Sequence, residues 1–255
     1  MFKNITTILA GAAFGLLSLV ACDQALEATD AATRDAEALT RGEARLAACI
    51  ETQCELLDID GMRLADYTVI NGLTHVKVLM VSRTGLDDLA DIADMQQLTE
   101  LHITDTDITD LTGLQNFPKL KVLHFERMPA GVDISPIGQL ARLTELALGN
   151  LGEGSNASFI KTLRRLERLK IRWVGVDADL SIFQNHPSLR TIDIYGTLPT
   201  DQSALLTMRK LESINFYSNV GSFGYRSNAT TLNPDVREEL ELRGVFELIE
   251  TMIVC

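Results

Sequence analysis

The stretch LTELHITDTDITDLTGLQNFPKL, residues 98–120, decides the fold of this chain. It begins apolar-x-x-apolar-x-apolar, and its last residue, Leu120, opens another copy of the same pattern. Eight copies begin 22 or 23 residues apart, from Cys54 to Leu211. A fixed period of this length is typical of stacked repeats, because each unit leaves apolar surface that only its neighbours can cover. The pattern therefore predicts one continuous solenoid instead of separate globular domains.

Each copy has two halves with different periods. In the first half, Leu101 and Ile103 alternate with polar neighbours, which predicts a short strand with one buried face. In the second half, apolar residues recur at every third position, as at Ile108, Leu111 and Leu114. That spacing favours a 3₁₀ or extended return segment over an α-helix. The predicted fold class is an α/β repeat.

Residues 106–114 of the third copy resemble the internalin-type leucine-rich repeat of bacteria. The resemblance implies a leucine-rich-repeat solenoid of about eight repeats, a scaffold that mostly binds other molecules. The sequence departs from the family at the ninth position, where the usual Asn occurs once, at Asn219. The side-chain ladder that satisfies backbone groups at that position is therefore expected to be partial.

The segments that flank the repeats predict caps. Residues 23–53 place Leu46 and Ile50 on an apolar stripe at helical spacing, which predicts one helix or two short ones after a tether. Residues 220–231 are interpreted as a loop. The expected domains are a signal peptide at 1–21, a tether and helical cap at 22–53, the solenoid at 54–232 and a C-terminal cap at 233–255.

The C-terminal cap is predicted from its own start and stop signals. Asn233 and Pro234 fit the N-cap and first position of a helix, and Arg243 with Gly244 fits its end. Residues 245–254 are apolar and β-branched, so they predict a final strand that covers the edge of the last repeat.

Residues 1–21 have the order of a secretory signal peptide, with one Lys, an apolar core, no acid and Leu-Val-Ala before Cys22. The Cys after Leu-Val-Ala resembles the lipobox of bacterial lipoproteins. The resemblance implies that Cys22 is acylated and anchors the chain to a bacterial membrane, on the periplasmic face or the cell surface. Two alternatives are a plain signal peptide with an incidental Cys and an N-terminal anchor helix.

The other cysteines leave alternatives open. Cys54 is either a small buried residue of the first repeat or the partner of Cys49 in a disulfide, which requires the helix to end near Ile50. Cys255 is separated from them by seven strand spacings of about 4.8 Å, roughly 30 Å, so it is expected to be free or to pair between molecules.

Charge and motifs exclude several classes of function. The chain carries 23 Lys and Arg against 35 Asp and Glu, a formal net charge of −12. An acidic balance argues against nucleic acid as a partner and against adhesion of the protein surface to anionic lipid. The sequence holds no Walker loop, nucleophile elbow, His-Glu-x-x-His or Cys-x-x-Cys, so we expect no enzymatic activity and no cofactor. The sequence does not predict an oligomeric state.

The third, fifth, seventh and eighth positions of each copy are expected to point outward on the concave strand face. His102 and His124 then lie on adjacent strands, flanked by Glu100 and Glu126. Two imidazoles and a carboxylate make a weak candidate zinc site, and the alternative is a solvated polar ladder.

The sixth to eighth copies predict a partner-binding patch. Its expected members are basic and aromatic, the residue types enriched at binding hot spots. They are Arg168, Lys170, Arg172, Trp173, Tyr195 and Tyr217. As alternatives, Arg168 and Arg172 pair with Glu145 and Asp193, and Trp173 turns inward.

These observations predict a lipid-anchored envelope protein that binds a protein or other ligand through its concave face without catalysis. The alternative is a structural or assembly factor that acts through the caps of the solenoid. A metal-dependent enzyme at His102 and His124 is the third hypothesis.

Overall fold

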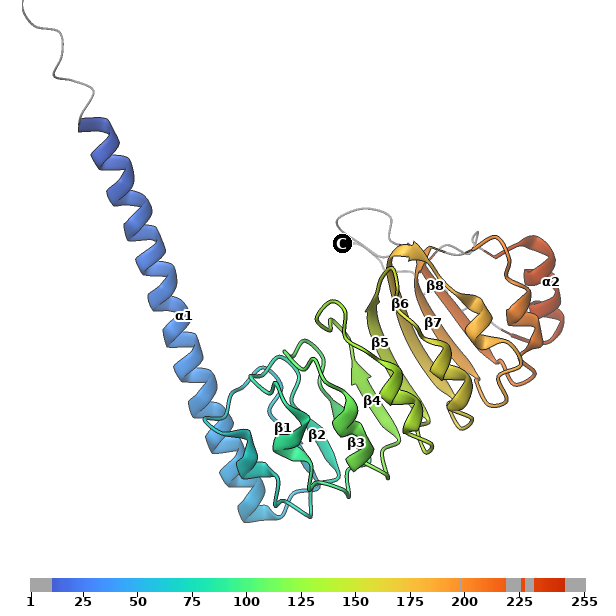
Figure 1. Cartoon of the computed structure of the whole chain (residues 1–255), viewed down its shortest axis with the longest axis horizontal. Helices are drawn as coiled ribbons and strands as arrows, with labels where there is room; N and C mark the ends of the chain where they lie inside the picture. The colour runs from blue at the N-terminus through green and yellow to red at the C-terminus, as the bar shows by residue number, and fades with distance from the viewer. Residues whose placement is uncertain (1–10, 198, 219–225, 228–231, 246–255) are drawn as a thin grey trace, which may run out of the picture.

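The computed structural model describes residues 11–197, 199–218, 226–227 and 232–245. These residues form one sheet whose strands follow chain order, with β1 to β8 parallel and β9 antiparallel to β8 (Figure 1). The strands are β1 (Leu56–Asp58), β2 (Val78–Met80), β3 (Glu100–His102), β4 (Val122–Phe125), β5 (Glu145–Leu151), β6 (Arg168–Asp177), β7 (Thr191–Thr197), β8 (Ser213–Ser218) and β9 (Arg226–Ser227).

A 3₁₀ turn follows each of the first seven strands and returns the chain to the start of the next. This result confirms that the three-residue spacing marks a return segment of 3₁₀ type. The turns are η1 (Tyr67–Ile70), η2 (Leu89–Ile92), η3 (Thr112–Asn116), η4 (Ser135–Gln139), η5 (Ser158–Thr162), η6 (Leu180–Phe183) and η7 (Ser203–Thr207).

The core lies between the sheet and the 3₁₀ turns and runs through all the repeats. The expected alternation is confirmed: Leu101 and Ile103 are fully buried, whereas His102 between them is partly exposed. The register is also confirmed, since Leu101 pairs with Leu123 and His102 pairs with His124. One apolar column thus stacks on the next along the solenoid.

The eighth position comes after the strand in the first four repeats and lies within β5 in the fifth. The residues there adopt a left-handed backbone, with positive φ at Arg83, Asp105, Arg127 and Asn150, and also at Gly61. The chain therefore turns away from the sheet, and these four non-glycine side chains are exposed.

The ninth position satisfies backbone groups in some repeats only. The Thr84 hydroxyl donates to the Val81 carbonyl at 2.6 Å, and the Thr106 hydroxyl donates to the Ile103 carbonyl at 2.9 Å. Thr197 is exposed. Asn219, the one Asn at this position, lies outside the described residues.

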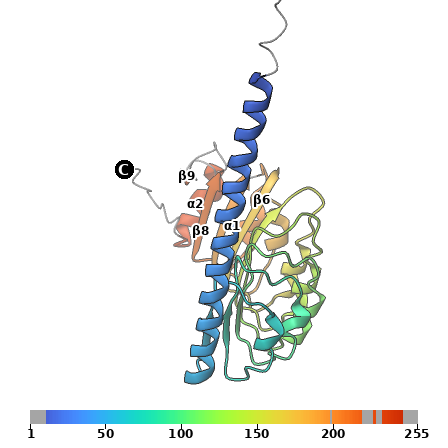
Figure 2. The ribbon, with the colours of Figure 1, turned by 90° about the vertical axis from the view of Figure 1, so that its left-hand side faces the viewer.

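The N-terminal cap is one long helix, α1 (Gly11–Thr52), which crosses the open side of β1 and continues beyond the sheet (Figures 1 and 2). It includes the residues expected to form a tether. Arg63 donates its N–H to the Ala38 carbonyl at 3.1 Å, and a Cβ on Gly42 would lie 1.9 Å from the Arg63 oxygen. Gly42 therefore allows this close approach.

A disulfide joins Cys49 to Cys54, with 4.9 Å between their Cα atoms. The helix ends at Thr52, two residues later than a bridge was expected to require. Gln53 then takes a left-handed conformation with φ of 52°, and the Cys54 N–H donates to the Cys49 carbonyl. That tight reversal brings the two cysteines together despite their five-residue separation.

Among the described residues, no helix is long and apolar enough to span a membrane. Acylation of Cys22 and cleavage before it remain predictions.

The C-terminal cap contains the expected helix, α2 (Pro234–Leu242), which packs Val236 and Leu240 against the last repeat. Asn233 is the N-cap residue and Pro234 the first helical residue, as predicted, although the Asn233 side chain makes no capping hydrogen bond and its amide donates to the Thr200 carbonyl at 2.8 Å. The loop interpretation of residues 220–231 needs correction, since β9 lies within it and pairs with β8. The strand expected at 245–254 falls, after Val245, outside the described residues, as does Cys255.

Candidate binding site on the strand face

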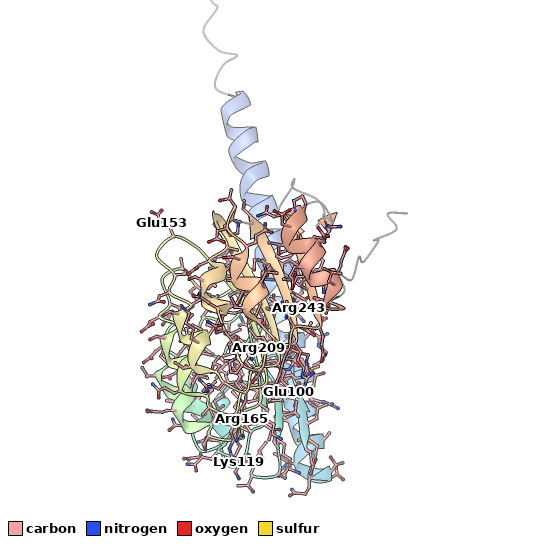
Figure 3. All side chains as sticks on the ribbon, turned by 90° about the vertical axis from the view of Figure 1, so that its right-hand side faces the viewer. Glu100, Lys119, Glu153, Arg165, Arg209 and Arg243 are labelled. Carbon is pink, nitrogen blue, oxygen red and sulfur yellow. A yellow bond between two sulfur atoms is a disulfide. The ribbon has the colours of Figure 1, made fainter. Side chains whose placement is uncertain are left out.

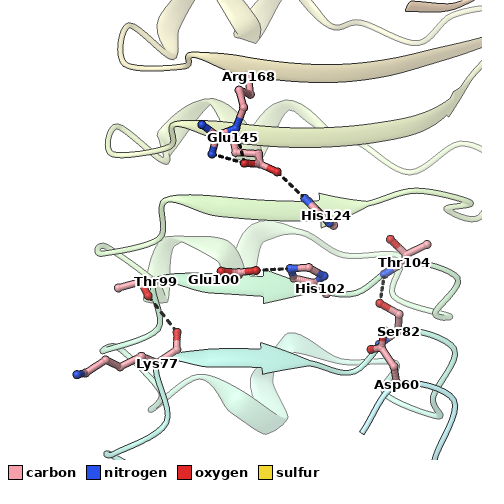
Figure 4. A network of polar contacts seen from close by, with 10 residues as sticks. All are labelled: Asp60, Lys77, Ser82, Thr99, Glu100, His102, Thr104, His124, Glu145 and Arg168. Atoms are coloured by element: carbon pink, nitrogen blue, oxygen red, sulfur yellow. Dashed lines mark hydrogen bonds and ion pairs between the residues drawn. The ribbon is translucent and has the colours of Figure 1, made fainter. Parts of the chain in front are cut away.

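The outward side of β1 to β8, here called the strand face, carries the candidate site. The first four strands contribute imidazoles, carboxylates and small hydroxyls (Figure 4). At the seventh position, for example, the Ser82 N–H donates to Asp60 at 2.7 Å and the Thr104 N–H donates to the Ser82 hydroxyl at 3.3 Å. These contacts tie neighbouring strands together.

His102 and His124 lie side by side, with 4.2 Å between their ring centroids. Each ring contacts a different acid: His102 Nε2 lies 2.7 Å from Glu100, and His124 Nε2 lies 3.2 Å from Glu145. Burial lowers the pKa of His124, the nearby His102 lowers it further, and Glu145 opposes the shift. The face therefore presents His124 as a neutral imidazole near pH 7.

The weak zinc candidate is not assembled. Glu126 bonds Lys170 at 2.9 Å and does not join His102 and His124. In the described part of the chain, no group of three or more His, Cys, Asp and Glu side chains could hold a metal ion. The polar ladder, which was the alternative, describes this region.

Two ion pairs cross the middle of the face, Lys170 with Glu126 and Arg168 with Glu145. Arg168 bonds Glu145, as one alternative expected, and Glu145 also contacts His124 (Figure 4). Burial raises the pKa of Glu145, but the hydrogen bonds and charges of Arg168 and His124 outweigh it and hold this pKa below its usual value. The side-chain amide of Asn215 donates to Asp193 at 2.6 Å.

Small residues on β5 separate the two halves of the face. Ala147 at the fifth position and Gly149 at the seventh replace the longer side chains found on neighbouring strands. Lys170 reaches across Ala147 from β6 to Glu126, the residue that follows β4. The gaps beside them are hollows of about 210 Å³ over Ala147 and about 450 Å³ over Gly149.

Two aromatic residues of the predicted patch, Tyr195 and Tyr217, lie side by side on the strand face. Tyr195 and Tyr217 stack with ring centroids 4.3 Å apart and planes 11° apart. The Arg172 guanidinium lies 5.1 Å from the Tyr195 centroid, and the Lys170 amine lies 5.6 Å from it. Burial raises the pKa of Tyr195 well above its usual value, with Tyr217 and Asp193 adding to the effect, so its hydroxyl stays protonated.

The placement of Trp173 in this patch is wrong. Trp173 is only 4 % exposed and belongs to the core. It occupies the eighth position, but β6 continues to Asp177, so the strand does not end before this position as it does in the first four repeats. The alternation of the strand then puts Trp173 on the same inner side as Leu169 and Ile171.

The sequence did not predict two features, the pair of small residues on β5 and a buried histidine. Ala147 and Gly149 are visible in the sequence, and their pairing at both outward positions of one strand was the available signal. His186 is also buried, at a return-segment position where other repeats have Phe117 or Leu163. Its pKa is lowered by burial.

Comparison with solved structures identifies the fold. An internalin (inlF) of Listeria monocytogenes superposes with a TM-score of 0.54 at 22 % identity, over 66 % of this chain and 56 % of that one. Internalin C2 (inlC2) of the same species gives 0.54 at 19 % identity, over 66 % of this chain and 74 % of that one. This chain is a leucine-rich-repeat protein of internalin-type fold. No protein-family model matches the sequence, and no curated protein is significantly similar to it.

The leucine-rich-repeat assignment therefore fixes the architecture, and the aligned part is little more than half of the inlF chain. The side chains of the strand face determine which partners the protein can bind.

Proposed function

We propose that this leucine-rich-repeat protein binds a protein or peptide partner through its strand face, without catalysis. The observation that carries the proposal is the stack of Tyr195 on Tyr217 with the Arg172 guanidinium beside it. Tyr and Arg are the types of residue that dominate binding hot spots. Because stacking already fixes these rings, ordering them on binding costs little conformational entropy.

A photo-crosslinking amino acid at position 191 would test the proposal in membranes of the native source. Thr191 is a partly exposed residue of β7 on the strand face. Lys119, at the other end of the strands from Glu153, gives the control position (Figure 3). We expect a specific adduct from position 191 and none from position 119.

The partner captured in this way would then be tested against variants. Tyr195→Ala and Arg172→Ala should each weaken binding about thirtyfold, the effect of losing a central anchor. Lys119→Ala should bind normally. Wild-type binding by both patch variants, in folded protein, would show that the strand face is not the site.

The proposal includes an anchor in a bacterial envelope. It is supported by Leu-Val-Ala before Cys22 and by the Cys49–Cys54 disulfide, which suits an oxidising compartment. Cys22→Ser should release the protein from the membrane fraction or block its processing. A variant that still fractionates with membranes at unchanged mass would refute the anchor and leave the binding proposal standing.

An assembly role through the caps is favoured by one observation. Among the described residues, the exposed large apolar side chains lie on the two caps or the first repeat: Ile50 (46 % exposed), Leu56 (42 %), Val69 (49 %) and Leu242 of α2 (78 %). Exposed apolar residues that gather at one place mark contact surfaces. If Val69→Glu abolishes capture while Tyr195→Ala does not, the cap is the binding surface.

A further inference from the structure

The hollow over Gly149 has an unusual charge for this chain. Arg127, Lys170 and Arg172 line it with one carboxylate, Glu126, and Asp105 bonds Arg127 at 3.0 Å, so the local balance with both acids counted is 3 − 2 = +1. The whole chain carries −12. A cationic depression on an acidic protein attracts an anionic group selectively, because the rest of the surface repels it.

The three cations reach the hollow for separate structural reasons. The left-handed turn at the eighth position directs Arg127 outward from the end of β4. Lys170 and Arg172 lie in β6, at the fifth and seventh positions of the sixth repeat. Between these strands β5 offers only Ala147 and Gly149, so the cations border an open space of about 450 Å³.

The neighbouring side chains already restrain two of these cations. Lys170 bonds Glu126 at 2.9 Å, and Arg172 lies against the Tyr195 ring. A ligand carboxylate that enters the hollow therefore meets donors held in place and does not have to order them. Charge-assisted hydrogen bonds from Lys and Arg to a carboxylate are among the strongest that proteins make.

A second hollow lies next to this one. Asn150 lines both this hollow and another of about 410 Å³ between the loops that follow β4 and β5. Glu153 lies at the tip of the second loop (Figure 3). The two hollows, which meet at Asn150 and are here together called the trough, are both open, and such an arrangement suits an extended chain more than an enclosed small molecule.

We propose that this trough holds an extended peptide segment of the partner and that the hollow over Gly149 takes the carboxylate of an Asp or Glu side chain in that segment. The inference rests on the proposed function, since it names the chemistry of the partner at the strand face. The aromatic stack would hold the neighbouring part of the same partner.

The test is an NMR titration of the full chain with two capped tripeptides, Ac-Ala-Glu-Ala-NH₂ and its neutral isostere Ac-Ala-Gln-Ala-NH₂. We expect the acidic peptide to shift the amide signals of Gly149, Asn150 and Arg172 in a saturable manner. The neutral peptide should bind about tenfold more weakly, as expected for the loss of one charge-assisted contact. Equal binding of the two peptides, or no shift at β5, would overturn the inference.

Two variants make the titration specific. Gly149→Ala places a Cβ 3.3 Å from the Glu126 Cβ, in the lining of the hollow, without altering charge. Lys170→Met removes one cation at similar length. Each should weaken the acidic peptide about tenfold, whereas Gly72→Ala, which meets no atom within 4 Å, should not. Wild-type affinity in folded Gly149→Ala and Lys170→Met would also overturn the inference.

The two proposals can fail separately. If capture of the partner depends on Tyr195 while the acidic tripeptide leaves β5 unperturbed, the carboxylate subsite is wrong and the strand-face proposal stands. If capture is insensitive to Tyr195, the strand-face proposal is wrong. The inference then falls with it, even if the tripeptide binds.

Discussion

The two halves of the sheet use the same repeat but end their strands differently. β1 to β3 contain three residues each and end at the fifth position, ahead of a left-handed eighth residue, whereas β6 contains ten residues and continues through the eighth position. The eighth side chain is exposed at Arg83 and buried at Trp173. A residue is thus placed by where its strand ends, and its position in the repeat does not decide this alone.

The largest test of this comparison replaces the buried eighth residue. Trp173→Ala should destabilise the protein by about 3–5 kcal/mol, because a large core side chain leaves a cavity. Chemical denaturation of the full chain measures the change. Arg83→Ala, at the same position of the second repeat, should cost under about 1 kcal/mol as an exposed substitution. Similar costs at both positions would contradict the difference between the halves.

The regular half can be tested by its alternation. Leu101→Ala and Ile103→Ala should each cost about 2–5 kcal/mol, because both side chains are fully buried. His102→Ala between them should cost under about 1 kcal/mol. If all three variants unfold at the same denaturant concentration, the register of the first half is wrong.

The sequence predicts the regular half well because one signal decides both its local and its tertiary structure. Apolar residues at the fourth and sixth positions dictate the strand, and stacking of like positions dictates the register, so Leu101 and His124 lie where the pattern puts them. The pairing of Tyr195 with Tyr217 follows from the same rule and is equally well predicted.

The errors occur where a second factor decides. The length of β6 depends on the backbone after Trp173. The repeat pattern does not predict how far the strand continues there. The end of α1 depends on the left-handed conformation of Gln53. Glycine usually marks such a position in a sequence, and here it is absent. The hollow over Gly149 forms because small residues leave space between longer side chains. A search for chemically active side chains does not detect such a space.

The two ends of the solenoid provide a second comparison. The first repeat is closed by a helix and the Cys49–Cys54 disulfide, and the last by β9 and α2. Changing both cysteines to Ala should cost about 2 kcal/mol, as expected for a bridge that closes a short loop. Hydrogen exchange should locate the loss at β1 and leave Ile171 and Ile194 protected. A loss spread evenly over all repeats would show instead that the solenoid opens as one unit.

The smallest expected effect is a dependence of stability on pH, carried by the partly buried His124 in the first half and the buried His186 in the second. The pKa values of His124 and His186 are both lowered by burial from the ordinary value of 6.5. Below pH 6.5 the unfolded chain binds protons that the folded chain refuses, so stability is fully present above that pH and declines as the pH falls toward 5. Each group contributes at most about 1.4 kcal/mol per pH unit.

Variants assign this slope to the two halves. His186→Met installs a side chain of the type that other repeats have at this position, as Met95 does, and should remove the contribution of the second half between pH 7.5 and 5. His124→Gln should remove that of the first half. Glu145, whose pKa is lowered below 4.5, acts only at more acidic pH and does not interfere in this range. Denaturation midpoints across the range give the slopes. If both variants keep the wild-type slope, the two imidazoles are not the groups that titrate, and burial on the face and in the core does not perturb them as the structure indicates.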